Sequence, residues 1–204
     1  MIAVASRPGS MTLARSLLWL AVAWNLAEGV IAVSSGLIAG SVALIGFGLD
    51  SFIEVGAAGI LLWRIGVPHD DPRVEGRETL ARRVVGVTFL VLAAYVVSES
   101  VYVLVAGSEP EVSPVGIGLA IASLAIMPAL GLVKRGNARR LQSPALVAES
   151  TETLICSYLS LTLFVGLATN AATGWGWADV AAALAMVPWI VKEGIEGVRG
   201  EPCE

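Results

Sequence analysis

Residues 41–56 read SVALIGFGLDSFIEVG, an apolar run that two acidic residues interrupt. Asp50 and Glu54 are four residues apart, so in a helix both side chains project from the same face. The apolar run continues to residue 65, which is long enough to cross a membrane, since a span takes about 20 residues. We interpret residues 41–65 as a transmembrane helix with two carboxylates near its middle.

The rest of the chain has the composition of a membrane protein. Its 204 residues are 56% hydrophobic and 15% charged, whereas about a quarter of the residues of a soluble domain are charged. We predict an all-α membrane protein of six transmembrane helices that form a single domain over residues 1–204, with no soluble domain. The predicted spans are residues 13–35, 41–65, 84–106, 115–133, 145–172 and 178–195.

The basic residues predict the orientation of the spans. All 13 lysines and arginines fall towards the two chain ends or in and beside the connections after the second and fourth spans. By the positive-inside rule, both termini are therefore cytoplasmic. We expect a multi-pass protein of the cell membrane, of the bacterial inner-membrane kind, surrounded by lipid. Its two cysteines, Cys156 and Cys203, do not suggest a disulfide framework.

A second acidic stretch occupies residues 143–156, SPALVAESTETLIC. Glu152 and Cys156 are four residues apart, and Glu149 lies one turn earlier. Counted along the helices, Asp50 and Glu152 both lie roughly 12–14 Å deep, near the middle of a hydrocarbon layer about 30 Å thick. An acidic residue there costs about 2.5–3.5 kcal/mol, and we expect no lysine or arginine at the same depth. The carboxylates must therefore be protonated or hold a cation from outside.

The two stretches also resemble each other. A Ser-x-Ala-Leu sequence precedes Asp50 by five residues in one and Glu152 by five residues in the other. The second span runs inward and the fifth outward, so the first three and last three helices can form an inverted repeat. We therefore predict a 3+3 inverted repeat.

These residues predict a divalent-cation site made by Asp50, Glu54, Glu152 and Cys156. Three carboxylates and one thiolate suit Zn²⁺ or Cd²⁺ better than Mg²⁺ or Ca²⁺, because a thiolate is a soft ligand. The alternative is that the carboxyl groups are protonated and hydrogen-bond between helices, and that Cys156 is a packing residue. The accessory or proton-relay candidates are Glu149, Glu28, His69 and Asp70.

A mechanism follows from the chemistry of such ligands. Burial without a cation favours the protonated forms of carboxylates and thiols, whereas metal binding requires deprotonated ligands and expels their protons. A site that is exposed alternately to the two sides would exchange metal for protons. We therefore predict a secondary transporter that exports divalent, Zn²⁺-like transition-metal cations by proton antiport. The metal is its substrate, and we expect no permanent cofactor.

The same motifs resemble those of the cation diffusion facilitator family, whose members export Zn²⁺ and related metals, commonly in exchange for protons. Residues 40–56 are similar to the second-helix motif, in which two acidic residues four apart bind metal. Residues 143–156 are similar to the fifth-helix motif, Ala-Leu-x-Ala-Asp-x-x-His-x-x-x-Asp. Glu149 falls on its first Asp, Glu152 on its His and Cys156 on its last Asp. The His and the last Asp are thus replaced, and the family's cytosolic dimerising domain has no counterpart in this divergent sequence.

Two further readings stay open. One is a non-transporting membrane module that binds metal or a protein partner through the same helices. The other is a transporter of an organic cation, for which Phe47, Phe52 and Tyr158 lie close to the carboxylates. The pair Gly36 and Gly40, small residues four apart, is compatible with a homodimer. No phosphate loop, nucleophile triad or nucleic-acid-binding patch occurs, so we expect neither an enzyme nor a nucleic-acid partner.

Overall fold

Six helices make up almost all of the described chain. The computed structural model describes residues 8–65, 72–107 and 109–199. Within these ranges there is no strand, which confirms the predicted all-α fold class. The helices are α1 (Pro8–Ala39), α2 (Val42–Ile65), α3 (Pro72–Ala106), α4 (Pro114–Leu141), α5 (Pro144–Thr173) and α6 (Trp177–Arg199).

Five of these helices, α1 to α5, are long and apolar enough to cross a membrane. The remaining helix, α6, has 23 residues, and at 1.5 Å per residue it is about 35 Å long, enough to cross the layer. It differs from the others in carrying charged residues near both ends. The chain is therefore a multi-pass membrane protein.

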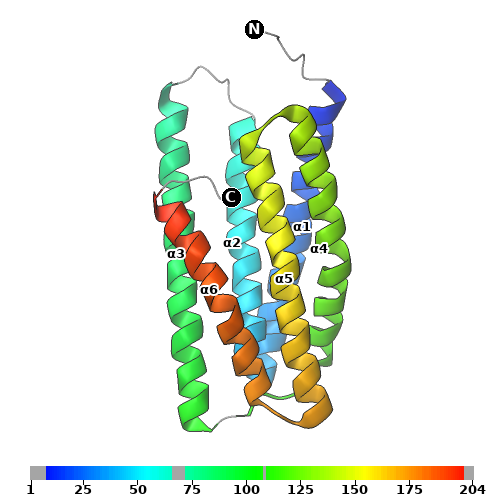
Figure 1. Ribbon diagram of the computed structural model, residues 1–204, viewed down its shortest axis with the longest axis vertical. Helices are drawn as coiled ribbons and strands as arrows, with labels where there is room; N and C mark the ends of the chain where they lie inside the picture. The colour runs from blue at the N-terminus through cyan, green and yellow to red at the C-terminus, as the bar shows by residue number, and fades with distance from the viewer. Residues whose placement is uncertain (1–7, 66–71, 108, 200–204) are drawn as a thin grey trace.

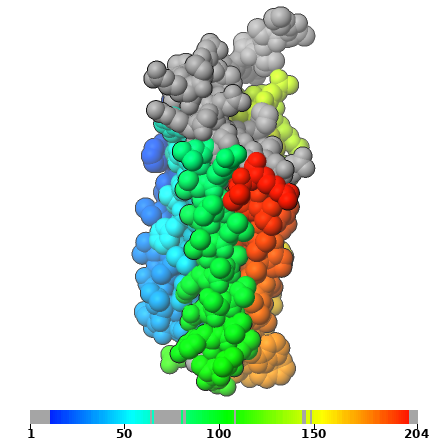
Figure 2. Space-filling view, turned by 90° about the vertical axis from the view of Figure 1, so that its left-hand side faces the viewer, coloured from blue at the N-terminus to red at the C-terminus, as the bar shows by residue number. Residues whose placement is uncertain are grey.

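The helices run alternately up and down in one bundle (Figure 1). Helix α1 begins and α6 ends at the same end, called here the basic end because Arg139, Arg140 and Arg199 lie in the last turns of helices that finish there. The most closely packed pairs are α1 with α2, α3 with α6, and α4 with α5. Figure 2 shows α3 and α6 side by side on one face of the molecule. The side of the membrane that the basic end faces, and the inverted repeat, stay predictions.

Lipid contact shapes the outer surface of the bundle. Large apolar side chains point outward, among them Ile38 and Val105, which are 82% and 83% exposed. Small polar residues lie inside instead, and the buried Ser160 hydroxyl donates a hydrogen bond to that of Ser123 at 2.9 Å. Because lipid offers no hydrogen-bonding partners, this inside-out distribution is the one expected of a membrane bundle.

A close approach of α1 and α2 fixes the helix that carries the first acidic pair. Gly48 on α2 faces α1, and a Cβ there would lie only 2.9 Å from the Cβ of Ala32 and from the backbone nitrogen of Val33. A larger residue at position 48 would therefore push the two helices apart.

The short connection between α4 and α5 fixes where the second acidic stretch begins. Gln142 ends α4 in the left-handed conformation, with φ of 51°. Ser143 then caps α5 by accepting a hydrogen bond from the backbone N–H of Leu146, and Pro144 is the first helical residue. Serine at the N-cap followed by proline is a favoured helix start.

Most predicted spans are shorter than the helices that contain them, and in two cases the difference moves basic residues from a connection into a helix. We expected the fourth span to end at residue 133, but α4 continues to Leu141, so Lys134 lies within a helix and not in a connection. The third was expected to begin at residue 84, but α3 begins at Pro72. Membrane thickness limits the apolar stretch and not the helix itself, because lysine, arginine and glutamate are good helix formers.

Candidate metal centre

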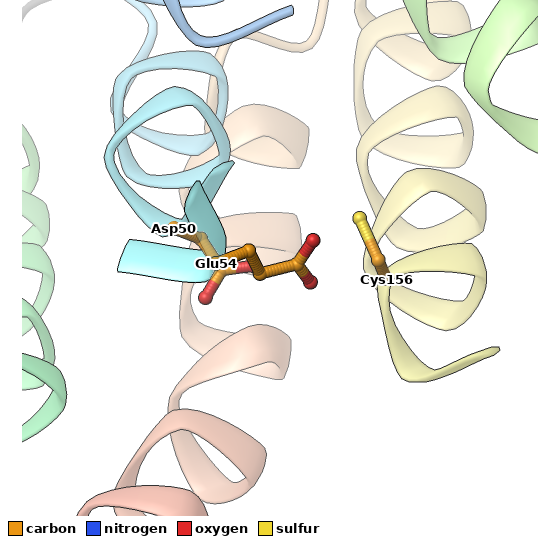
Figure 3. A group of neighbouring side chains, drawn as sticks. All are labelled: Asp50, Glu54 and Cys156. Carbon is orange, nitrogen blue, oxygen red and sulfur yellow. The ribbon is translucent and has the colours of Figure 1, made fainter. Parts of the chain in front are cut away.

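Helices α2 and α5 bring two carboxylates and a thiol together inside the bundle. Asp50 and Glu54 project from α2 towards α5, and Cys156 projects from α5 towards them (Figure 3). Their ligand atoms all lie within 4.8 Å of one another. Asp50 is 3% exposed, Cys156 is fully buried, and Glu54 is half-buried. The sequence predicted a site of four ligands, and the structure places three of them in one cluster.

The fourth predicted ligand, Glu152, lies beside this cluster. It lines a cavity of about 20 Å³ together with Asp50 and Glu54. A cavity of that size has room for about one water-sized group. Glu152 therefore shares the cavity of the site, although it lies outside the group of three.

A further carboxylate, from α6, lines the same cavity and was missed at the level of the sequence. Glu193 is 5% exposed and lies on the cavity wall with Asp50 and Glu152. The signal that could have found it is helical spacing, because Glu193 follows the buried Ile190 by three residues.

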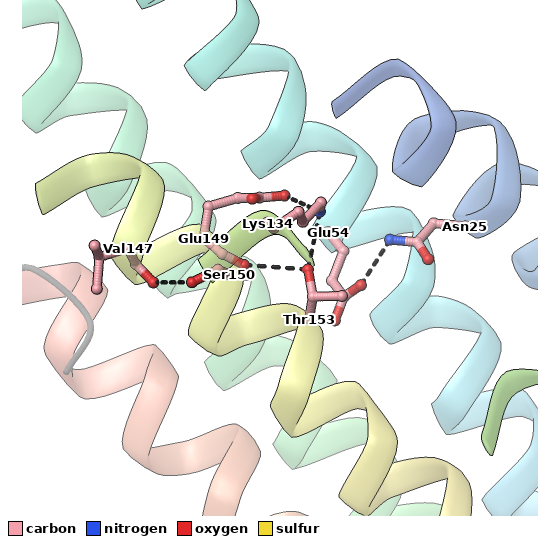
Figure 4. Close-up of polar contacts among 7 residues, drawn as sticks. All are labelled: Asn25, Glu54, Lys134, Val147, Glu149, Ser150 and Thr153. Atoms are coloured by element: carbon pink, nitrogen blue, oxygen red, sulfur yellow. Dashed lines mark hydrogen bonds and ion pairs between the residues drawn. The ribbon is translucent and has the colours of Figure 1, made fainter. Parts of the chain in front are cut away.

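Glu149 does not share the cluster, and its surroundings overturn one expectation. The ammonium group of Lys134 on α4 donates hydrogen bonds to the Glu149 carboxylate and, at 2.9 Å, to the Thr153 hydroxyl (Figure 4). Both charged side chains are buried. The expectation that no lysine or arginine lies among the buried acids was therefore wrong, because Lys134 was assigned to a connection. Glu149 already has a cation partner supplied by the protein.

The cluster itself has no such partner. Among the described residues, no lysine, arginine or histidine forms an ion pair with Asp50, Glu54 or Cys156. An uncompensated buried charge is strongly unfavourable. The cluster is therefore stable either with its groups neutral or with a cation between them.

Glu28 of α1 lies behind the cluster and is 1% exposed. Its carboxylate accepts hydrogen bonds from the Ser51 hydroxyl at 3.1 Å and from the Trp24 indole N–H at 3.3 Å. Because Ser51 is next to Asp50 in α2, Glu28 lies close to the site. It is not one of the three clustered residues. Its role as a relay stays a prediction.

Asn25 of α1 also contacts the site, and no charge in the sequence pointed to it. Its side-chain Nδ2 donates a hydrogen bond of 2.6 Å to Oε2 of Glu54 (Figure 4). Asn25 is 3% exposed. The amide thus fixes one oxygen of a candidate ligand, as residues around metal ligands often do. The remaining accessory candidates, His69 and Asp70, lie outside the described residues.

The cluster has the donors of a transition-metal site. Carboxylate oxygen and thiolate sulfur are both ligands of Zn²⁺, which takes four ligands in most protein sites. Asp50, Glu54 and Cys156 can supply three, and Glu152 lies at the same cavity. The soft sulfur favours Zn²⁺ or Cd²⁺ over Mg²⁺ or Ca²⁺.

Comparison with known proteins agrees with this geometry. Residues 18–199 match the Cation_efflux family, the cation efflux transmembrane domain. The chain is 25% identical over 147 residues to transmembrane protein 163 of Xenopus laevis, covering 72% of this chain and 52% of the relative. It is 27% identical over 178 residues to an uncharacterized transporter of Synechocystis sp., covering 84% of this chain and 57% of the relative. The matches thus extend over little more than half the length of each relative.

Proposed function

The chain belongs to the cation efflux transmembrane domain family, and from that premise we propose that it is a secondary transporter of a divalent transition-metal cation. The observation that carries the proposal is the buried group of Asp50, Glu54 and Cys156, whose ligand atoms lie within 4.8 Å of one another. Family membership supports cation transport in general, and the donor set supports a transition metal as the substrate.

The thiol directs the choice of metal. Cys156 is fully buried and faces two carboxylates. A site with one sulfur and several oxygen donors favours borderline and soft ions, so we propose Zn²⁺ as the physiological cargo and expect Cd²⁺ to bind as well. The cavity beside the cluster, at about 20 Å³, suits a bare or nearly bare ion and not an organic cation.

Proton exchange follows from the lack of a counter-ion. Because the cluster has no ion-pair partner among the described residues, it is stable without metal when its groups carry protons. Metal binding then displaces those protons. If the site opens alternately to each side, uptake of protons from one side drives metal out to that side.

Flux measurements in proteoliposomes test the proposal. We expect the purified chain to move Zn²⁺ or Cd²⁺ when a pH gradient is imposed, and to stop doing so when the gradient is removed with an ionophore. Asp50→Asn, which is nearly isosteric, should reduce the flux to that of protein-free liposomes. Ser98→Ala is the matched control, because Ser98 is exposed on α3 and its hydroxyl donates to the Tyr95 carbonyl oxygen of the same helix, so the flux should be unchanged.

Two results would contradict the proposal. Wild-type protein that is folded and reconstituted but moves no divalent metal under the gradient would favour a non-transporting membrane module. Equal flux through wild type and Asp50→Asn would show that the cation crosses elsewhere.

A further inference from the structure

We propose that Asn25 of α1 is a selectivity-determining residue of the cation site: its amide N–H holds Glu54 when no cation is bound, and the amide turns over to supply its oxygen Oδ1 when a divalent cation binds. This inference rests on the proposed function, since it adds a ligand to the same site. It also adds α1 to the two helices, α2 and α5, that carry the other candidate ligands.

The first observation is the contact between Asn25 and Glu54. The side-chain Nδ2 of Asn25 lies 2.6 Å from Oε2 of Glu54, across the interface between α1 and α2. Figure 4 shows the Asn25 amide directed at the Glu54 carboxylate. The Asn25 amide is therefore in contact with a candidate ligand and not merely near it.

The second observation is the other end of the same amide. Oδ1 of Asn25 is buried and has no hydrogen-bond partner among the described residues, and Asn25 is 3% exposed. Buried polar atoms in native proteins nearly always have a partner, and a group without one calls for an explanation such as an ion. Once the amide has turned over, a divalent cation held by Glu54 would supply that missing partner.

The packing around Asn25 keeps the amide at the site. Gly29, one turn further along α1, faces α2, and a Cβ there would lie 3.0 Å from the Phe52 ring and 3.1 Å from the Gly48 carbonyl oxygen. The α1 backbone therefore lies against α2 beside the cluster and cannot move Asn25 away. Rotation about the Cβ–Cγ bond exchanges Nδ2 and Oδ1 without moving the helix, because the two atoms share one carbon.

The chemistry of an amide oxygen predicts its effect on selectivity. It is a neutral, hard donor of the kind that binds Mg²⁺, Ca²⁺ and Mn²⁺. Together with Asp50, Glu54 and Cys156 it would give four donors from three helices, the number that Zn²⁺ prefers. Its loss should therefore weaken the binding of a hard ion such as Mn²⁺ more than that of Cd²⁺, which the Cys156 sulfur retains.

Two substitutions separate a ligand from a residue that only positions Glu54. Asn25→Ala removes both the donor and the oxygen. Asn25→Asp has nearly the same shape and keeps an oxygen ligand, but its carboxylate cannot donate a hydrogen bond to Glu54. If Oδ1 binds the cation, Asn25→Asp should bind Mn²⁺ at least as tightly as the wild type. If Asn25 acts only by donating to Glu54, Asn25→Asp should be as impaired as Asn25→Ala.

The experiment is calorimetric titration of the purified full chain in detergent with Mn²⁺ and, separately, Cd²⁺. We expect Asn25→Ala to weaken Mn²⁺ binding by about 10-fold or more, a typical size for losing a residue that supports a metal site, and to weaken Cd²⁺ binding less. Asn170→Ala is the matched control, because Asn170 is equally buried but donates to the Pro110 carbonyl oxygen, away from the site. Its affinities should equal those of the wild type.

The outcomes are distinguishable. Wild-type protein that binds neither ion would contradict the proposed function itself. Wild-type binding with an unaffected Asn25→Ala, or with Asn25→Asp as impaired as Asn25→Ala, would overturn the role of Oδ1 and leave the proposed function standing. If Asn25→Ala does not yield folded protein, the comparison of Asn25→Asp with wild type decides alone, since a ligand role predicts retained binding of Mn²⁺.

Discussion

Helix α5 contributes to two buried acidic regions. In one a lysine pairs with the carboxylate, and in the other no described basic side chain does. Near the start of α5, Glu149 pairs with Lys134 of α4, so the protein provides its own cation. Two turns later, Cys156 faces Asp50 and Glu54 of α2, and no described basic side chain forms an ion pair with this group. The two regions share one helix and are only two turns apart along it.

The difference distinguishes a structural ion pair from a candidate transport site. A buried carboxylate with a tethered ammonium group is neutralised permanently, so it serves to hold α4 against α5. A buried cluster without such a partner is neutralised either by protons or by a metal ion from solution. Within the described part of the chain the Asp50 cluster has no fixed counter-ion, which suits it to a cargo that must also leave.

The largest expected effect comes from breaking the paired region. Lys134→Met leaves Glu149 buried and uncompensated, which should lower the free energy of unfolding by about 3–5 kcal/mol. Denaturant titration in detergent, followed by circular dichroism, measures this change. Adding Glu149→Gln to Lys134→Met should restore most of the loss, since no charge is then left unpaired.

That comparison fails if the double variant is no more stable than Lys134→Met alone. Such a result would mean that Lys134 stabilises the bundle through packing, or through Thr153, and not by neutralising Glu149.

An intermediate effect comes from changing the unpaired region without removing its charge. Cys156→Asp replaces the soft sulfur with a hard oxygen donor, so preference should shift from Cd²⁺ towards Mn²⁺ by about tenfold or more, equivalent to about 1.4 kcal/mol. Competition between the two ions in proteoliposome flux measures the ratio. An unchanged ratio would show that Cys156 is a packing residue.

The smallest effect on stability should come from a partly exposed ion pair on α6. Lys192 and Glu196 are 3.4 Å apart, and the lysine side chain is 42% exposed. Exposed pairs of this kind contribute about 0–1 kcal/mol, so Lys192→Gln should change the free energy of unfolding by less than about 1 kcal/mol. If Lys192→Gln lowers the free energy of unfolding as much as Lys134→Met does, burial does not determine how much an ion pair contributes to stability.

The acidic residues show how far sequence alone could reach. Asp50 and Glu54 were placed correctly on one helical face because a four-residue spacing fixes direction whatever the neighbours are. Cys156 was found by the same spacing from Glu152. The six helices followed from apolar length, which a membrane imposes on any sequence.

The partners of these residues were harder to predict. Lys134 was assigned to a connection because basic residues usually mark the end of a span, and only its contact with α5 shows that it is buried. Asn25 carries no charge, so nothing distinguished it within an apolar run. Contacts between helices depend on how the bundle rotates each helix, which spacing along one helix does not determine.

The most direct test of the account is proton release during metal binding. Cd²⁺ should be added to the purified protein in weakly buffered detergent solution while pH and bound metal are followed together. Each bound Cd²⁺ should release about one proton or more, and Asp50→Asn should release fewer protons or should not bind. The double variant Lys134→Met with Glu149→Gln should release as many as the wild type. Metal binding without proton release, or release that is unchanged in Asp50→Asn, would contradict the claim that the cluster exchanges protons for a cation.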